Sequence, residues 1–310
     1  MNPKITLIYL ITIVSFCRAD SASEDYKSGN FESAALRFQI QAEAGDARSQ
    51  KNLGALYLRG KGVPQNYQKA YDLFLRSADE NFIGAMFNLG IMNLRGYGRA
   101  INYPEALLWF KKGAELGDPE AQFFLGVLFS KGLGVTPNAA RAKTWFLKSA
   151  NHGLAAAQYN LAILLLRDSE HSSNRSNALH WLKKADEQEH EMATFQLATE
   201  YLKNPENQKH REKASQLMLK LAKKGHVRAQ MQLGLLYLFG DAQNLNSEEG
   251  FFWLKESAMQ NFAPAQHNLG AVYAQGVSGE PNMMRAYAWL KIASNSVSYT
   301  HLTLPTNREV

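Results

Sequence analysis

Leucine recurs along this chain at a constant spacing of 36 residues. The next residue is Gly or Ala in every copy, the residue four before is Ala in six of the seven copies, and the residue four after is Tyr or Phe in five. Positions spaced in this way share one face of an α-helix. The pattern predicts one helix per copy, with small residues that let a second helix approach closely. The recurring leucines are Leu53, Leu89, Leu125, Leu161, Leu197, Leu233 and Leu269.

A second helix is predicted to follow in each copy. The residue 17 after the leucine is Ala in six copies and Gly250 in the other, and all five tryptophans of the chain stand 20 residues after it. We interpret the tryptophan as a wedge that packs between helix pairs and not as a platform for a ligand. The tryptophans are Trp109, Trp145, Trp181, Trp253 and Trp289.

Gly and Asn recur where these helices should end and begin. Glycine in a left-handed conformation is the usual residue at the end of a helix, and Asn is a favoured N-cap. The glycines expected to end the first helix are Gly60, Gly96, Gly132, Gly240 and Gly276. The expected N-caps of the second helix are Asn66, Asn102, Asn138, Asn174, Asn246 and Asn282, with His210 interrupting the series. The residues expected to close the second helix are Gly117, Gly153, Gly225, Asn81 and Asn261.

The predicted fold class is all-α, an α/α superhelical solenoid of helix-turn-helix repeats with a 36-residue period. One pair of helices cannot bury its apolar face alone, so neighbouring pairs must stack. Residues 47–296 form about seven repeats, the last one truncated. Residues 20–46 form an N-terminal capping helix near Ser23–Ser28 and a half-repeat whose single helix is expected over Phe31–Gly45.

The first 19 residues have the pattern of a secretory signal peptide. Lys4 precedes a largely apolar run of 12 residues from Ile5 to Phe16, and small residues stand at positions 17 and 19. The alternatives are an uncleaved anchor or a buried first helix. The rest of the chain has no apolar stretch long enough to cross a bilayer, so no membrane span is expected in the mature chain.

The last 14 residues, 297–310, are expected to lie outside the fold. Val297 to Thr306 reads VSYTHLTLPT, which resembles a translated transposase adapter of the kind used in sequencing libraries. We interpret 297–310 as a non-native, adapter-derived tail; the alternative is a genuine Thr-rich tail. This segment is excluded from the fold prediction.

The repeat resembles the Sel-1-like repeat family. The resemblance rests on Ala-x3-Leu-Gly-x2-Tyr-x2-Gly-x-Gly-Val followed by Lys-Ala, and it is clearest in LGALYLRGKGVPQNYQKA within residues 50–78. Copies four and five depart from it, because Asp168, Glu170, Asn204 and Glu206 stand where loop glycines should be. The family is similar to tetratricopeptide arrays, and the resemblance implies an adaptor or scaffold role in protein complexes.

Composition limits the chemistry that the chain can perform. It has 34 Lys and Arg against 28 Asp and Glu, a net charge of +6, and one cysteine, Cys17, inside the predicted signal peptide. A disulfide framework or a thiolate metal site is therefore excluded. No short Lys/Arg block concentrates the charge, so nucleic acid is not an expected partner. The basic second helix of copy five predicts either a solvated outer face or a docking patch for an acidic partner.

No catalytic, cofactor-binding or metal-binding residues are predicted, and the chain is not expected to be an enzyme. The loop glycines follow a helix, whereas a dinucleotide-binding motif follows a strand. The histidines have no metal-ligand spacing, and surface positions are the simplest interpretation of them. Asn174-Arg175-Ser176 is a glycosylation acceptor sequence if the host is eukaryotic, although Asn174 is also a predicted N-cap.

In similar helical repeats the first helix lines the concave side, and this predicts a partner-binding groove. Three rows of positions recur there, with aromatic side chains, amides and cations in successive copies. An extended peptide could bury apolar side chains on the aromatics, bond its backbone to the amides and pair its acidic groups with the cations. The alternatives are packing between repeats for the aromatics and helix-dipole stabilisation for the cations. The predicted groove residues are Asn52, Arg59, Phe87, Asn88, Arg95, Phe123, Lys131, Tyr159, Asn160, Arg167, Phe195 and Lys203.

The sequence favours an exported, non-catalytic adaptor or scaffold whose concave face holds a protein or an extended, acidic peptide. Two alternatives remain open. One is an exported hydrolase whose site is assembled across repeats, and the other is an envelope-associated structural protein that acts through its outer face. The signal peptide places the protein in the periplasm or outside a bacterial cell, or in the secretory lumen of a eukaryote.

Overall fold

The computed structural model describes residues 21–168, 172–203, 207–240, 246–277 and 279–302, with side chains described except at 172 and 296–302. Helices make up nearly all of these ranges, and no β-strand occurs within them. The predicted signal peptide lies outside the described residues. Of the predicted tail, 297–302 continue a helix and 303–310 lie outside.

The predicted all-α architecture is confirmed. A first helix begins every 36 residues, and a second helix follows each one. The first helices are α3 (Ala47–Arg59), α5 (Ile83–Arg95), α7 (Pro119–Lys131), α9 (Ala155–Arg167), α11 (Glu191–Leu202), α13 (Val227–Phe239) and α15 (Ala263–Gln275). The second helices are α4 (Tyr67–Asp79), α6 (Tyr103–Glu115), α8 (Ala139–Asn151), α10 (Ser172–Glu187), α12 (Gln208–Lys223), α14 (Ser247–Met259) and α16 (Met283–Leu302).

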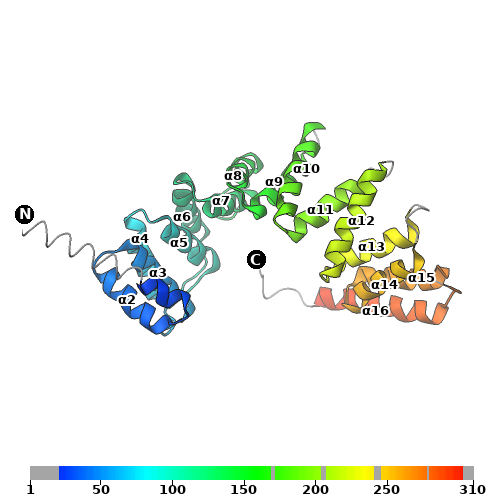
Figure 1. Cartoon of the computed structure of the whole chain (residues 1–310), viewed down its shortest axis with the longest axis horizontal. Helices are drawn as coiled ribbons and strands as arrows, with labels where there is room; N and C mark the ends of the chain where they lie inside the picture. Colours follow the sequence, from blue (N-terminus) through cyan, green and yellow to red (C-terminus); the bar gives the residue numbers. More distant parts are fainter. Residues whose placement is uncertain (1–20, 169–171, 204–206, 241–245, 278, 303–310) are drawn as a thin grey trace, which may run out of the picture. The chain divides into compact units, whose positions relative to one another are not determined.

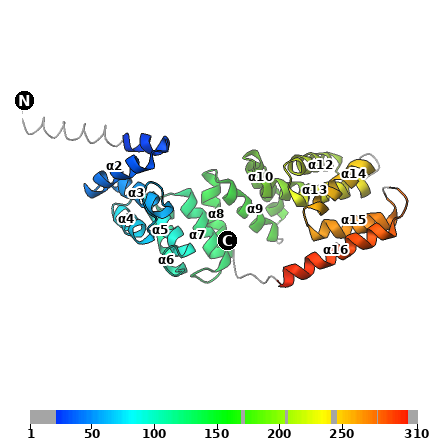
Figure 2. The same ribbon diagram turned by 90° about the horizontal axis from the view of Figure 1, so that it is seen from below.

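The chain divides into two compact units. The boundary between them in the sequence falls within α9, between Leu164 and Leu165. Within each unit, helices pack mainly against their neighbours in the chain, as the colour order in Figures 1 and 2 shows. Unit 1 begins with a helical segment at residues 21–27 and α2 (Phe31–Glu43), which are the expected cap and half-repeat. Ala34 and Ala42 of α2 are buried, as their places in the repeat predict.

The core of each repeat lies between its two helices, where one small residue meets one large side chain. The recurring leucine is buried in all seven repeats. The glycine after it faces a residue of the second helix so closely that a Cβ on Gly90 would lie 2.5 Å from the Phe110 ring, and one on Gly126 would lie 2.7 Å from the Phe146 ring. In these repeats the ring therefore occupies the space that a side chain on the glycine would need.

The size of the large residue differs between repeats. It is phenylalanine opposite the glycine in repeats one to three, and leucine opposite Gly234 and Gly270 in repeats six and seven. In repeats four and five the small position holds alanine, and the residues at the large position, Leu182 and Met218, are fully buried. The large residue stands next to the tryptophan position in the sequence, at Phe74, Phe110, Phe146, Leu182, Met218, Leu254 and Leu290.

The prediction that tryptophan packs between helix pairs is confirmed for Trp109, which is 6% exposed and belongs to one apolar cluster with Phe74 of repeat one and Leu89 of repeat two. Trp289 likewise packs against the apolar cluster of repeats six and seven. The four tryptophans other than Trp109 are half-buried. Three of the tryptophans also carry a lysine over the ring, 4.3 Å away for Lys112 on Trp109.

Buried polar groups form hydrogen bonds both between neighbouring repeats and within a repeat. In five repeats a buried glutamine of the first helix donates from its Nε2 to a carbonyl in the last turn of the preceding second helix, as Gln122 does to Ala114 at 3.2 Å. In three repeats a serine of the second helix donates to a carbonyl at the start of the first, as Ser149 does to Pro119 at 2.7 Å. These bonds satisfy groups that burial would otherwise leave unpaired.

The predicted asparagine N-caps are confirmed in five repeats. Each accepts a hydrogen bond on its Oδ1 from the amide three residues later, at 2.8 to 3.1 Å. The prediction for Asn174 is wrong, because α10 begins at Ser172 and Asn174 lies inside it. Asn174 is buried, and its Nδ2 donates to the Asp168 carbonyl at 3.0 Å, so the predicted glycosylation acceptor is engaged within the fold.

The interruption of the asparagine series at His210 has a similar explanation. Helix α12 begins at Gln208, three residues earlier than its equivalents, and Asn207 accepts from the His210 amide at 3.1 Å. The cap has therefore moved by almost one helical turn. Helices α10 and α12 both have 16 residues, whereas most of the others have 13.

Left-handed glycines end four of the five first helices for which they were predicted. Gly60, Gly96, Gly132 and Gly276 have φ between +64° and +71°. Gly240 differs, because its backbone is extended, with φ −74° and ψ −164°. The five residues predicted to close the second helix, Asn81 and Asn261 among them, all have positive φ.

The contact between small and large residues makes a direct prediction. We expect Gly126→Ala to lower the free energy of unfolding by about 1–3 kcal/mol, although alanine favours a helix, because the new methyl group overlaps the Phe146 ring. Adding Phe146→Leu recreates the combination of alanine and leucine that the sequence has at these two positions in repeat four, and it should recover part of the loss. Urea denaturation followed by circular dichroism measures both variants, and strictly additive losses would contradict the packing explanation.

The displaced cap of α12 can be tested in the same way. We expect Asn207→Ala to cost about 1 kcal/mol, because the His210 amide loses its acceptor. Asp is also a good N-cap, so Asn207→Asp should unfold at nearly the same temperature as the parent. Asn174 is not a cap, so Asn174→Ser and Asn174→Asp should be no more stable than Asn174→Ala. Thermal unfolding gives the comparison, and an unchanged Asn207→Ala midpoint would place the cap elsewhere.

Candidate functional site

The twelve predicted groove residues all lie on first helices or directly after one, beside the buried face and not on it. Unit 1 contains nine of them, and unit 2 contains Arg167, Phe195 and Lys203. The aromatic and amide residues are half-buried and the cations are exposed, so the three rows differ in their access to solvent.

The aromatic residues Phe87 and Phe123 continue the core towards the surface. Their ring centroids lie 5.9 Å from Phe110 and 5.8 Å from Phe146, which are the core phenylalanines of their repeats. Phe124 stands between them, 5.7 Å from Phe87 and 5.3 Å from Phe123. The three half-buried rings therefore form one continuous aromatic surface across α5 and α7.

Sequence reasoning missed Phe124. It occupies the position that holds Asn or Gln in the other six repeats, and it stacks on Phe110 at 5.1 Å with an interplanar angle of 10°. The signal was present as the one apolar exception in a polar row. The amide row is therefore interrupted in repeat three, where the aromatic surface is widest.

Two of the amides already have partners in the fold. Asn160 donates from Nδ2 to the Ala156 carbonyl of its own helix at 2.8 Å, and Asn52 accepts from the Lys51 ammonium at 3.1 Å. Tyr159 and Phe195 are half-buried, and the Phe195 ring stacks on His226 at 5.3 Å.

The cation row consists of exposed side chains near the ends of the first helices. Within the described residues, Arg95, Lys131 and Arg167 have no ion-pair partner, and Arg59 donates to the Tyr26 hydroxyl at 3.4 Å. Lys203 differs, because its ammonium contacts the Glu200 carboxylate at 2.5 Å. Burial lowers the pKa of Lys51, and the nearby Arg59 and Arg48 of the same helix add to this effect.

Glu200 is an acidic residue in an apolar position. Its equivalents in repeats one to three are Leu56, Met92 and Leu128, and it is only 1% exposed. Lys203 and Arg175 neutralise it, with Arg175 Nε 3.5 Å from Oε2 and Arg175 Nη2 donating to the Glu200 carbonyl at 2.9 Å. Lys203 of the predicted groove is thus held by a structural ion pair.

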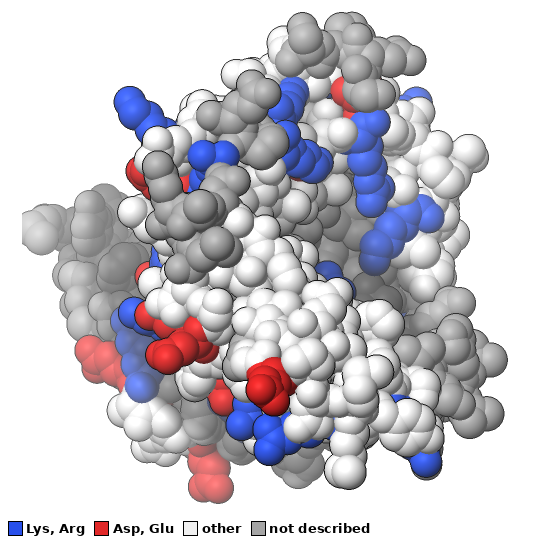
Figure 3. Space-filling model, turned by 90° about the vertical axis from the view of Figure 1, so that its right-hand side faces the viewer, with Lys and Arg blue, Asp and Glu red and all other residues white. Residues whose placement is uncertain are grey.

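The basic second helix of copy five is partly neutralised by the preceding repeat. Lys220 lies 3.8 Å from Asp186 and Lys224 lies 3.2 Å from Glu189, and these pairs bridge repeats four and five. Lys209, Lys213 and Lys223 are exposed. Figure 3 shows Lys and Arg in several separate groups on the visible face, with most Asp and Glu in its lower part.

Metal and acid–base chemistry have little support in the described part of the chain. No group of three or more His, Cys, Asp or Glu side chains there could hold a metal ion. Two histidines have a structural role, because His190 and His226 are N-caps whose Nδ1 accepts from the amide three residues later, at 3.2 Å in both cases. Burial lowers the pKa of His190, consistent with a neutral ring that accepts this bond.

The His190 cap predicts a pH dependence. A lowered pKa in the folded state means that its stabilisation is complete above the unfolded pKa of about 6.5 and is lost as the pH falls below it. We expect the His190→Asn variant, whose cap does not titrate, to lose less stability between pH 7.5 and pH 5.5 than the parent. Urea midpoints at the two pH values, with exposed His152→Asn as control, make the measurement; identical losses would contradict the assignment.

These features define a solenoid of helical hairpins. The Sel1 repeat model matches residues 47–82, 83–118, 119–154, 155–190, 227–262 and 263–296. The matches cover well over half of the chain, so the chain belongs to the Sel1 repeat family. Residues 191–226 lie between two matched segments and form α11 and α12 with the same period.

Solved structures of Sel1 repeat proteins have a similar fold. The Sel1 repeat protein from Oxalobacter formigenes is 24% identical with a TM-score of 0.66, over 92% of this chain and 89% of that one. The protective antigen c5321 of uropathogenic Escherichia coli, which displays an SLR fold, is 24% identical with a TM-score of 0.56, over 89% of this chain and 69% of that one. No curated protein sequence matches this chain.

Membership of the family assigns a general role. Sel1 repeat proteins generally mediate protein–protein interaction as scaffolds, and they are typically non-catalytic. Among the described residues, no helix is both long and apolar enough to cross a membrane.

Proposed function

We propose that this protein is an exported, non-catalytic adaptor that binds an extended, acidic peptide segment of a protein partner along its first helices. The observation that carries the proposal is the repeated set of exposed cations Arg59, Arg95 and Lys131 beside half-buried aromatic rings in unit 1. The equivalent position carries a cation in five successive repeats.

The two kinds of side chain supply different parts of the binding energy. Phe87, Phe123 and Phe124 offer a continuous apolar surface that is already ordered by packing on the core, so little entropy is lost when a ligand covers it. Arg95 and Lys131 have no acidic partner among the described residues, so a carboxylate would not have to displace one. An extended chain can meet both features repeatedly, because they recur with each repeat.

The preference for an acidic partner follows from the local charge. Burial is the main cause of the lowered pKa of Lys51, and the nearby Arg59 and Arg48 add to it. A peptide carboxylate would be attracted to these three positive charges.

Export is proposed from the first 19 residues alone. Their charged start, apolar run and small residues near the cleavage site indicate a secretory signal. The proposed compartment is the periplasm or the extracellular space of a bacterium, or the secretory lumen of a eukaryote. N-terminal sequencing of the protein secreted by its host tests this directly, and a mature protein that retains Met1–Ala19 would contradict it.

The groove is tested by reversing its charges. We expect the triple variant Arg59→Glu, Arg95→Glu, Lys131→Glu to weaken binding of acidic 12-residue peptides, selected from a displayed library against the parent, by roughly tenfold or more. Fluorescence anisotropy gives the affinities, and circular dichroism confirms an unchanged helix content.

A matched variant separates the groove from the outer face. Lys69→Glu, Lys112→Glu, Lys148→Glu makes the same change in net charge on exposed residues of second helices. Peptide affinity should stay within about threefold of the parent. Equal losses in both variants would indicate a nonspecific charge effect, and a loss only in this second variant would place binding on the outer face; either result contradicts the proposal.

A further inference from the structure

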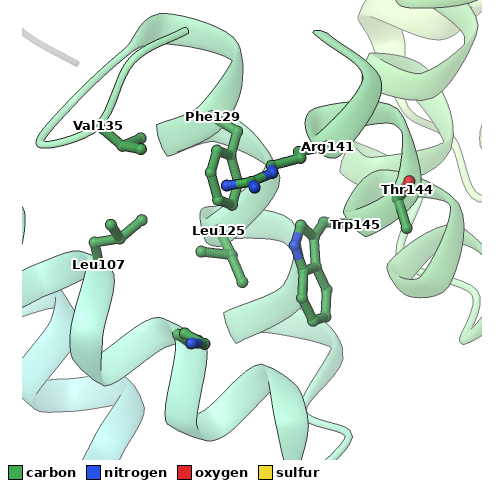
Figure 4. Close-up of a pocket in the computed structure, with 8 residues that line it drawn as sticks. Leu107, Leu125, Phe129, Val135, Arg141, Thr144 and Trp145 are labelled. Carbon is green, nitrogen blue, oxygen red and sulfur yellow. The ribbon is translucent and has the colours of Figure 1, made fainter. Parts of the chain in front are cut away.

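A pocket of about 470 Å³ lies between the second helices of repeats two and three, away from the proposed groove. Leu125 and Phe129 of α7 line its middle. Leu107 of α6 and Val135 line one side, and Trp145 of α8 lines the other. Figure 4 shows Leu107 and Val135 across the opening from Trp145. This volume suits a small ligand or one or two peptide residues.

Two cations stand at this apolar pocket. The Arg141 guanidinium lies 5.5 Å from the centroid of the Phe129 ring. Figure 4 shows Arg141 beside Phe129. Lys111 lines the α6 side of the pocket. Lys111 has an exposed partner in Glu115 at 3.8 Å, a contact of little energy. Helix α8 carries three basic residues and no acidic one. The pocket thus combines an apolar interior with positive charge.

In the preceding repeat, side chains fill the equivalent site. There, Tyr71 stands at the position of Leu107 and Arg99 at the position of Val135, 36 residues earlier in each case. The Arg99 guanidinium lies 3.3 Å from the centroid of the Tyr71 ring. Tyr71 and Trp109 are 7% and 6% exposed and belong to one apolar cluster, whereas Trp145 is left half-buried.

The charged residues change at the same positions. Lys111 replaces Leu75, which packs against the apolar cluster of the preceding repeat, and Arg141 replaces Glu105. The replacements that leave the interior open therefore also make its surroundings positive. Packing alone does not require this second change, because the filled version of the site has an apolar residue and a carboxylate at those two positions.

We propose that this pocket binds the C-terminal residue of a partner peptide, with its apolar side chain against Leu125 and Trp145 and its carboxylate on Arg141 and Lys111. A C-terminal residue carries an apolar group and a carboxylate within one small volume, which the pocket's composition matches. The pocket shares helix α7 with the groove but is lined by different residues, so it is a second contact beyond the proposed groove and does not depend on it.

The test uses the tetrapeptide acetyl-Gly-Gly-Ser-Phe with a free carboxylate, and its C-terminal amide, added to the full protein. The reporter is the indole N–H signal of Trp145 in a ¹H–¹⁵N NMR spectrum, assigned with Trp145→Phe. We expect a saturable shift of this signal with the acid and at least fivefold weaker binding of the amide. No shift up to 5 mM acid, or equal binding of acid and amide, would overturn the proposal.

Two variants make the assignment specific. Leu107→Tyr with Val135→Arg copies the filled pocket of the preceding repeat and should abolish the shift, whereas Leu147→Tyr, at an exposed position of α8, should not. If the double variant does not fold, Arg141→Gln serves instead, and it should weaken binding of the acid at least fivefold and leave the amide unchanged. Undiminished binding in the folded double variant, or in Arg141→Gln, would overturn the site.

A third variant separates this proposal from the groove. The triple change Arg59→Glu, Arg95→Glu, Lys131→Glu should leave the Trp145 shift and its concentration dependence intact. Loss of that shift would place the tetrapeptide in the groove and overturn the pocket. Retention of the shift, together with loss of the selected acidic peptides, is the result expected if both contacts exist.

Discussion

The structure depends on the close approach of two helices at one small residue in each repeat. The glycine or alanine after the recurring leucine lets the second helix place a large side chain over it, as Phe146 lies over Gly126 and Leu254 packs against Gly234. Only one register brings them into contact, so each hairpin has the same geometry. In five repeats a buried glutamine then joins the hairpin to the helix before it. A constant period of 36 residues is the consequence.

Positions that this packing does not use are free to serve binding. The groove residues Arg95 and Lys131 are exposed beside the core, and no ion pair within the described residues occupies them. Near α6 and α8, the replacement of Tyr71 and Arg99 by Leu107 and Val135 leaves space that the preceding repeat fills. A repeat protein can therefore acquire a distinct site in one repeat while its neighbours retain the common core. The two proposed contacts use different residues of the same unit.

The fold could be predicted because its determinants recur. Leucine spacing, glycine ends and asparagine caps each signal one helix boundary, and seven copies make chance agreement negligible. The incorrect predictions concern copies that depart from the pattern, and the missed residues depend on contacts in three dimensions. Asn174 lies inside a lengthened helix, and Gly240 is extended. Phe124, Glu200 and the pocket depend on contacts between repeats, which no single-repeat pattern reveals.

Deletion of one complete repeat tests the account most directly. Removal of residues 83–118 takes out α5 and α6 and joins two positions that are equivalent in the repeat, so the remaining hairpins can still stack. Circular dichroism during urea denaturation should show unchanged helicity per residue and a cooperative transition at lower urea, whereas deletion of 83–100, which leaves α6 without its partner, should reduce helicity per residue. Loss of helical structure in the 36-residue deletion to the same extent as in the shorter one would contradict a solenoid of equivalent hairpins.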